Sequence, residues 1–509
     1  MSGKTVTLRA DTRETQRQMT ALATADSTAP QKLTHRQTMW IVAGVLLPVF
    51  MGSMDQTVVS SALPSIGNSL GGTHYLSWVV AANLLTMTAM TPLYGKISDI
   101  IGRRSTLLIG VSVFMVASLV SALAVNLPML IVGRALQGLG SAGMTSLAMT
   151  ILGDVAAPKD RARYYTYFSI VYITSGAVGP MWGGFASQHL HWSAVFWLNV
   201  PMGLCALTLL WFLLKKLPRH ERPHKLDILG AVLIVAASSS CLFVLNAGGA
   251  NYPWGSPEIM GASLFSAFCW IAFVRRLLTA PEPLIPIGVL KNRVVLLATI
   301  SNGVGWASVT GLNIYLPMFL QAVHGYSPSG AGVAVIPLMV TVNASALVGA
   351  HLTGRLTHYK IPPLISLAVG VAACLWLAFR AETIGFTEFM IVVAIIGSGF
   401  GPSAPTSTVA MQNAVELHQM GISVATMSFT RSLVATGLVA AYGLIALGFS
   451  ARGMNSQEAV ETVRSFFGGP AEAAAHFRLI FLCTAGTFSI SFLAFLMMEE
   501  RPLMSERAK

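Results

Sequence analysis

Long apolar segments alternate with short polar segments along almost the whole chain. Apolar stretches of about twenty residues recur from Met39 to Met498, and at about 1.5 Å per residue each can cross a hydrocarbon core of roughly 30 Å. The pattern predicts an all-α polytopic membrane protein. Its fourteen predicted spans lie at residues 39–62, 75–97, 104–124, 128–152, 164–187, 192–214, 226–247, 257–277, 294–320, 329–350, 363–379, 386–412, 421–447 and 479–498.

The second and tenth spans are followed by similar polar loops. Gly95-Lys96-Ile97-Ser98-Asp99 resembles Gly354-Arg355-Leu356-Thr357-His358. Two successive six-helix halves would place the repeated loop after spans two and eight. Because it follows spans two and ten, we predict two related six-helix halves with two extra spans between them. Internal repeats of this kind are typical of secondary transporters. The predicted parts are a disordered cytoplasmic tail (1–37), an N-terminal six-helix bundle (38–214), a linker with two extra spans (215–293), a C-terminal six-helix bundle (294–498) and a short cytoplasmic tail (499–509).

Composition and charge agree with a membrane protein. Apolar residues make up 54% of the 509 positions and charged residues only 10%, against roughly a quarter in soluble domains. The formal charge of +12 does not indicate nucleic-acid binding, because the basic residues are distributed over many loops instead of forming one basic face. With cytoplasmic termini, 26 Lys and Arg fall in cytoplasmic segments, four in outer loops and two inside spans. This bias predicts that both termini lie in the cytoplasm. The membrane itself is expected to be a plasma (bacterial inner) membrane.

The sequence gives no sign of an enzyme, a cofactor or a metal. No paired carboxylates or zinc-ligand spacing stands out, and the five cysteines lie singly within apolar spans. Gly138-Leu139-Gly140-Ser141-Ala142-Gly143 fits the dinucleotide fingerprint, but it lies within a span and not after a strand. The absence of a P-loop run favours an ion gradient as the energy source.

Asp55 is the candidate proton-coupling residue. A carboxylate within a span costs roughly 2.5–3.5 kcal/mol unless it is paired or hydrated. Burial disfavours the charged form, so Asp55 could carry a proton and release it when solvated or near a positive charge. The alternative is a buried salt bridge that only holds helices together.

Arg134 is the candidate partner of Asp55. Counted from the outer helix ends, Asp55 lies about 12 Å deep and Arg134 about 9 Å deep, so the two side chains could meet. Arg134 would then lower the acid's proton affinity in one conformation and withdraw in the other. A structural arginine bonded to helix carbonyls is the alternative.

The loop after the second span carries a candidate latch. Its sequence, Gly95-Lys96-Ile97-Ser98-Asp99-Ile100-Ile101-Gly102-Arg103-Arg104, places an acid four residues before a base. Such a loop can hold helix ends together, whereas the alternative is an ordinary positively charged turn. The candidate latch residues are Gly95, Asp99, Gly102, Arg103 and Arg104.

This loop resembles the signature of the major facilitator superfamily. Further motifs resemble the fourteen-span drug:proton antiporters, the EmrB/QacA-like group of multidrug efflux transporters. Ile100 and His358 depart from the pattern, which weakens the latch role of the two loops. The matching motifs are Met54-Asp55-Gln56-Thr57-Val58-Val59 with Ala62-Leu63-Pro64; Arg134, Gln137, Gly138 and Gly140; the fifth-span antiporter motif of Gly176, Gly179, Pro180, Gly183 and Gly184; Trp192, Phe196, Asn199, Pro201 and Gly203; and Leu226-Asp227-Ile228-Leu229-Gly230-Ala231.

The resemblance implies the major facilitator fold and a proton-coupled antiporter. It would export amphipathic or cationic drugs by alternating access and so give antibiotic resistance, and it implicates Arg134 in proton transfer. Some relatives work with a periplasmic adaptor protein, so such a partner stays open. A dedicated exporter of one metabolite or siderophore is the second hypothesis, and a non-transporting membrane sensor is a third.

Polar side chains inside the spans are candidates for the substrate path. Each has an alternative interpretation, a hydrogen bond that packs helices together or, for Arg431, a structural role. These candidates are Asn83, Gln137, Asn313, Gln321, Asn343, Gln412 and Arg431.

Overall fold

The computed structural model describes residues 35–71, 76–156, 158–216, 227–248, 252–326, 328–356, 358–416, 419–447 and 470–500. Within these ranges the chain is helical and forms no strand. The helices of the first part are α2 (His35–Leu70), α3 (Leu76–Ile101), α4 (Arg103–Ala122), α5 (Leu127–Ser141), α6 (Met144–Val155), α7 (Pro158–His189), α8 (Ala194–Trp197), α9 (Asn199–Leu213) and the 3₁₀ helix η2 (Leu214–Lys216). The remaining helices are α10 (Ile228–Ala247), α11 (Pro257–Thr279), α12 (Ile287–Lys291), α13 (Arg293–His324), α14 (Pro328–Arg355), α15 (Ile361–Arg380), α16 (Phe386–Phe400), α17 (Ser403–Ala414), α18 (Met420–Leu447) and α20 (Pro470–Met497).

Every predicted span overlaps one helix or two successive helices. Eleven helical segments of the described chain are long and apolar enough to cross a membrane, so the count of fourteen stays a prediction. Several helices extend beyond the predicted spans. Helix α2 runs from His35, within the predicted tail 1–37, to Leu70, and α20 begins at Pro470, before the predicted span 479–498. The rest of the predicted N-terminal tail lies outside the described residues.

Three predicted spans are interrupted, two of them at a glycine or proline and the third at Leu198, shortly before a proline. The fourth divides into α5 and α6 at Ala142 and Gly143, and the twelfth divides into α16 and α17 at Gly401 and Pro402. The sixth divides into α8 and α9 just before Pro201. Proline lacks the backbone donor that continues a helix, and glycine relaxes the backbone, so these residues permit the breaks. By contrast, α7 runs unbroken through Pro180.

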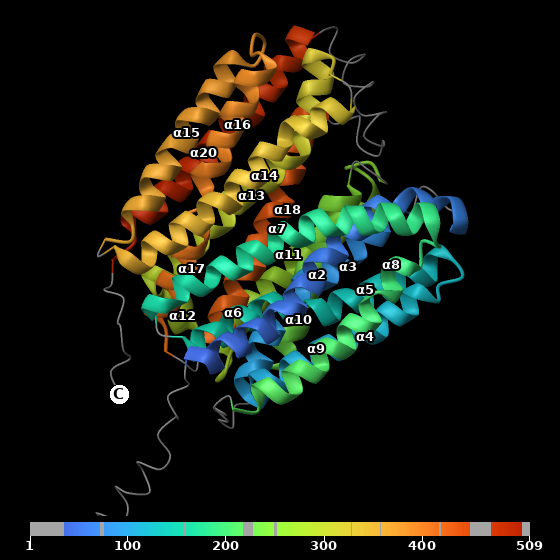
Figure 1. Ribbon diagram of the computed structural model, residues 1–509, viewed down its shortest axis with the longest axis vertical. Helices are drawn as coiled ribbons and strands as arrows, with labels where there is room; N and C mark the ends of the chain where they lie inside the picture. The colour runs from blue at the N-terminus through green and yellow to red at the C-terminus, as the bar shows by residue number, and fades with distance from the viewer. Residues whose placement is uncertain are drawn as a thin grey trace, which may run out of the picture.

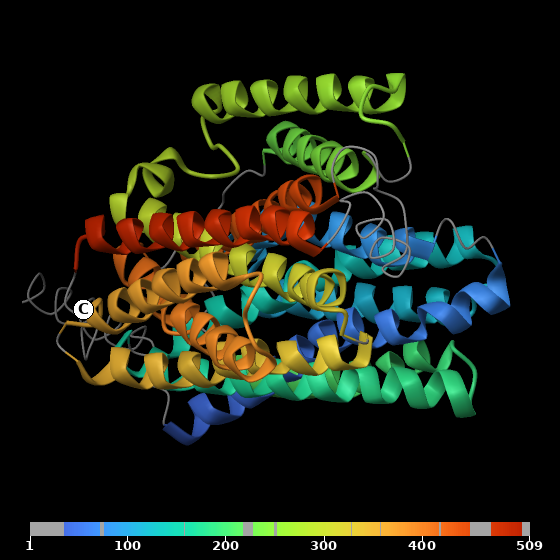
Figure 2. The same cartoon turned by 90° about the horizontal axis from the view of Figure 1, so that it is seen from above.

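The helices pack into two bundles (Figure 1). The first contains α2 to α9 and the second contains α13 to α20. The most extensive contacts between them are those of α3 with α18 and of α7 with α14, and smaller ones join α6 to α18 and α7 to α17. The hairpin of α10 and α11 lies outside both bundles, with α11 at the edge of the molecule and α10 beneath it (Figure 2). Helix α10 contacts both α3 and α18.

The buried cores show that the bundles meet closely at one end only. One core cluster combines residues of both bundles, among them Val42, Leu152, Val294 and Val424. Two other clusters belong to single bundles, one within residues 58–196 and the other within residues 309–488. We call the end with the shared core, where α2 begins and α20 finishes, the closed end. Toward the opposite end the two bundles diverge (Figure 1).

Candidate functional site

Asp55 and Arg134 form an ion pair inside the first bundle. Arg134 Nη1 lies 2.6 Å from Asp55 Oδ2, and each side chain is only 1% exposed. Asp55 comes from α2 and Arg134 from α5, so the pair joins two helices. Opposite charges that are shielded from water attract each other strongly, although burying them is costly. Removing one partner of such a pair typically lowers the stability of the fold by about 3–5 kcal/mol.

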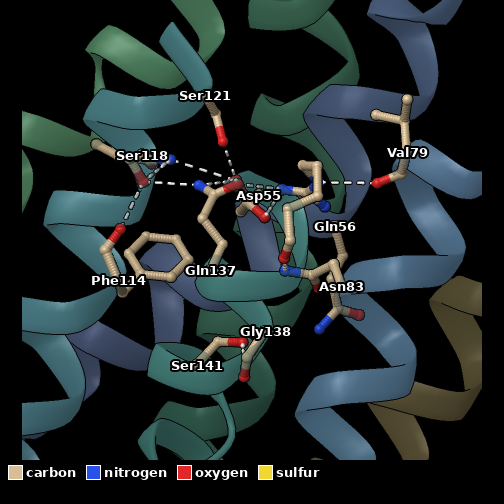
Figure 3. A network of polar contacts seen from close by, with 12 residues as sticks. Asp55, Gln56, Val79, Asn83, Phe114, Ser118, Ser121, Gln137, Gly138 and Ser141 are labelled. Atoms are coloured by element: carbon tan, nitrogen blue, oxygen red, sulfur yellow. Dashed lines mark hydrogen bonds and ion pairs between the residues drawn. The ribbon is translucent and has the colours of Figure 1, made fainter. Parts of the chain in front are cut away.

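Two amide groups also donate to the Asp55 carboxylate (Figure 3). Gln137 Nε2 lies 3.3 Å and Asn199 Nδ2 3.2 Å from Asp55 Oδ1. Both amides also donate to Ser118 Oγ on α4, at 2.6 Å and 3.3 Å. The carboxylate therefore accepts hydrogen bonds on both oxygens, from α5 and α9.

Arg134 is fixed by further contacts. Its Nε donates to the carbonyl oxygen of Val79 on α3 at 3.0 Å, and its Nη1 donates to Gln137 Oε1 at 2.8 Å. The guanidinium carbon lies 5.9 Å from the centre of the Phe196 ring. Arg134 therefore connects α2, α3 and α5, and its withdrawal from Asp55 would require these helices or its own rotamer to change.

Small residues let α5 pack closely against α3 and α4, which places Arg134 and Gln137 beside Asp55. A Cβ at Gly138 would overlap Thr86 Oγ1 on α3, and one at Gly133 would lie 2.5 Å from Ser121 Oγ on α4. Asn126 caps the start of α5 by accepting from the Met129 amide at 2.9 Å. The run from Gly138 to Gly143 is therefore part of a helix-packing surface, in keeping with rejection of the dinucleotide fingerprint.

The candidate latch lies at the closed end and joins both bundles. Asp99 on α3 pairs with Arg103 at the start of α4, and Arg103 Nε donates to Asp154 Oδ2 on α6 at 3.1 Å. Across the interface, the backbone amide of Ile422 donates to Asp99 Oδ2 at 3.2 Å. Ile422 lies in the first turn of α18, where the helix dipole is positive and favours an acid.

The other candidate latch residues have different positions. A Cβ at Gly95 would lie 2.5 Å from Ala425 Cβ, so this glycine allows α3 to approach α18. Gly102 has φ +91°, a conformation that favours glycine. Arg104 stays within the first bundle, where its Nη2 donates to the Trp211 carbonyl at 3.0 Å.

The antiporter motif on α7 divides into two kinds of position. A Cβ at Gly179 would overlap Thr57 Oγ1, and one at Gly183 would overlap Ser61 Oγ, so both glycines pack on α2. Gly176 and Gly184 have nothing within 4 Å of an added Cβ. Two of the four glycines therefore set the distance between α7 and the helix that carries Asp55.

The candidate substrate-path residues do not gather in one place. Asn83 and Gln137 are buried in or beside the Asp55 network. Gln412 Nε2 joins the bundles near the closed end, donating to the Met149 carbonyl at 3.1 Å and to Tyr165 Oη at 2.9 Å. Gln321 and Asn343 donate to carbonyls of their own helices. Asn313 is exposed, and Arg431 is half-buried beside Trp306.

A comparison with known families decides the identity of the fold. The sequence matches the model of the Major Facilitator Superfamily over residues 45–440. The chain belongs to the major facilitator superfamily. It is 30% identical over 415 residues to the multidrug transporter protein MdtP of Bacillus subtilis, covering 80% of this chain and 74% of that one. It is 32% identical over 400 residues to the efflux pump dotC of Dothistroma septosporum, covering 77% and 68%.

Solved structures of other major facilitator proteins share the fold. A bacterial homologue of the iron transporter ferroportin, in an outward-facing state, has a TM-score of 0.60 at 13% identity and covers 91% of this chain and 99% of that one. The human organic anion transporter MFSD10 has a TM-score of 0.59 at 16% identity, with 90% and 99% covered. These structures support the fold, and the family match together with the multidrug transporter that is 30% identical makes this chain a membrane transporter for small molecules.

Several residues of these sites were not among the sequence candidates. Asn199 was noted only as part of a motif, although an amide inside an apolar span was a usable signal. Asp154 was not singled out, although it is an acid at the end of the fourth span. Ser118, the Val79 carbonyl and the Ile422 amide carried no signal, because a hydroxyl or a backbone group in a span does not reveal its partner.

Proposed function

We propose that this major facilitator protein is a proton-coupled antiporter that exports amphipathic compounds from the cytoplasm by alternating access. The observation that carries the proposal is the Asp55 carboxylate, buried at 1% exposure and held by one guanidinium and two amides. Two relatives, a multidrug transporter and an efflux pump, support export of drug-like compounds.

The chemistry of the pair connects protonation to movement. Separating Arg134 from an ionised Asp55 would leave an uncompensated buried charge, which is strongly unfavourable. A proton on Asp55 removes the acid's charge and weakens its hold on Arg134, so the contacts between α2, α5 and α9 can then change. Substrate binding in the alternative conformation releases the proton and restores the pair. Proton exchange and helix rearrangement thus depend on each other.

The conformation fits an outward-facing step of this cycle. The excess of Lys and Arg in the loops of the closed end supports a cytoplasmic position for that end. The latch of Asp99, Arg103 and the Ile422 amide then holds the cytoplasmic side shut while the bundles diverge on the other side. We place the protein in a plasma membrane of the bacterial inner-membrane type, with both termini in the cytoplasm.

The test is proton-driven transport of Nile red, an uncharged amphipathic dye, in proteoliposomes with an imposed pH gradient. We expect the parent protein to transport the dye and Asp55→Asn to lose gradient-driven transport. Glu388→Gln is the matched control, since Glu388 forms a partly exposed pair with Arg380 at 3.7 Å, far from the network. If Asp55→Asn transports as well as the control, or a sodium gradient drives the parent equally, the coupling assignment fails.

The breadth of substrates is tested in the same proteoliposomes. Competition with Nile red by chemically unrelated amphipathic compounds is expected of a multidrug exporter. Competition by a single chemical class would instead indicate a dedicated exporter of one metabolite.

A further inference from the structure

Arg431 is a charged side chain in the middle of α18. It lies roughly 16 Å along the helix from Met420, at about 1.5 Å per residue. The side chain is half-buried, and no acidic group of the described residues forms an ion pair with it. Its guanidinium carbon lies 5.1 Å from the centre of the Trp306 ring on α13. A mid-span arginine without a counter-charge is costly, at roughly 2.5–3.5 kcal/mol, so its position calls for a reason.

The face of α13 beside Arg431 is polar. Trp306 is 36% exposed, and its ring packs against Phe400 at 6.2 Å, which fixes the ring. Further along the same side of the helix, Thr310 and Asn313 retain exposure. Thr310 and Asn313 follow Trp306 at intervals of four and three residues, so the three side chains share one face. A face with an amide, a hydroxyl and a neighbouring guanidinium suits an aqueous path better than lipid.

Among the residues that the structure describes, no acid lies near this face to bind a cation. Apart from Asp55, every Asp and Glu in the described part of the chain lies in a loop or within three residues of a helix end. Asp55 itself is buried and occupied by three donors in the other bundle. The accessible charge at mid-span is therefore positive.

We propose that Arg431 and Trp306 bind the acidic head and the ring of an amphipathic aromatic carboxylate. The planar guanidinium matches a carboxylate with two parallel hydrogen bonds, and the exposed indole offers a surface for an aromatic ring. The ligand would supply the counter-charge that the protein does not. The inference rests on the proposed function in taking this ligand as an exported substrate, and it names acidic amphipathic compounds as a class that this site prefers over their neutral analogues.

The experiment compares three ligands that differ only in head group: pyrenebutyrate, its neutral amide, and pyrenebutylamine. Equilibrium binding is measured to the full-length protein in phosphatidylcholine nanodiscs, against empty nanodiscs. We expect the parent to bind the carboxylate about tenfold more tightly than the amide, as charge-assisted hydrogen bonds imply. Arg431→Gln should remove this preference, and Trp306→Leu should weaken binding of the carboxylate and the amide.

Arg380→Gln is the matched control, because it removes an exposed arginine near a helix end and should leave the preference unchanged. The proposal would be overturned if Arg431→Gln kept the parent protein's preference for the carboxylate over the amide. Equal or tighter binding of the amine by the parent, or no binding of the carboxylate, would also overturn it. Binding needs no gradient, so Asp55→Asn should keep the preference; failure of proton coupling is thereby distinguished from failure of this site.

Discussion

At Asp55, both carboxylate oxygens accept hydrogen bonds, from Arg134 on one side and from Gln137 and Asn199 on the other. Asn199 is a positioning residue: it donates to the ionised acid from α9 and also contacts Ser118. It therefore fixes the position of the carboxylate without itself carrying a charge.

Replacing Asn199 with Leu should move the pH profile of transport. A hydrogen bond to a charged group contributes about 1.5–3 kcal/mol. Asn199→Leu removes this donor from the proposed proton-coupling carboxylate. We expect the pH profile of Nile red transport to differ measurably from that of the parent protein.

The control for this shift is Ser121→Ala, since the Ser121 hydroxyl donates to the Gln137 oxygen at 3.4 Å and not to Asp55. A midpoint that stays the same in Asn199→Leu, while Asp55→Asn abolishes transport, would show that Asn199 does not tune the acid.

The sequence identified the charged members of this site but not the uncharged ones. Asp55 and Arg134 were found because a charge inside a span is costly and rare. Asn199 and Ser118 were not selected, since amides and hydroxyls occur in many spans as packing groups. Their partners depend on which helices meet, and that is a property of the tertiary structure.

At the scale of elements, glycines decide how closely α7 approaches α2. Gly179 faces Thr57, two residues beyond Asp55, whereas Gly176 faces open space. The sequence motif gave the four glycines equal weight, because helical spacing alone does not say which face meets another helix.

Gly179→Ala and Gly176→Ala form a matched pair. The first places a methyl group against Thr57 and should destabilise the protein by about 1–3 kcal/mol through overpacking, with reduced transport. The second adds a methyl group where there is room and should be neutral or slightly stabilising. Thermal unfolding in detergent and Nile red transport measure both effects; equal behaviour of the two variants would contradict the packing assigned to α7.

Helix breaks at this scale were only partly predictable. Gly143, Pro402 and Pro201 are visible in the sequence, yet Pro180 lies within a continuous helix. A proline can be accommodated where neighbouring helices satisfy the freed carbonyl, so its effect is set by packing.

For the whole molecule, the hydrophobic pattern was enough to predict an all-helical membrane protein, and the motifs indicated the superfamily. The conformation was not predictable, because the same chain must adopt at least two arrangements during transport. The shared core at the closed end and the contact between Asp99 and the Ile422 amide identify the arrangement seen here.

Gly95→Val should open the closed end. A side chain at this position would meet Ala425 and the Gly421 carbonyl, at 2.5 Å and 2.9 Å from the Cβ alone, and would push α3 from α18. We expect a larger population of long distances between spin labels at Lys215 and Leu356, in a background without the native cysteines. Gly176→Ala should match the parent; an unchanged distribution in Gly95→Val would argue against this interface as the gate.

The most direct test of the account is whether Asp55 itself binds and releases a proton. Infrared difference spectra of the carboxyl C=O stretch, recorded in nanodiscs as the pH is lowered, report that event without a substrate. We predict a buried carboxyl band that titrates in the parent protein and in Glu388→Gln and is missing in Asp55→Asn. Identical titrating bands in the parent and in Asp55→Asn would contradict the central claim.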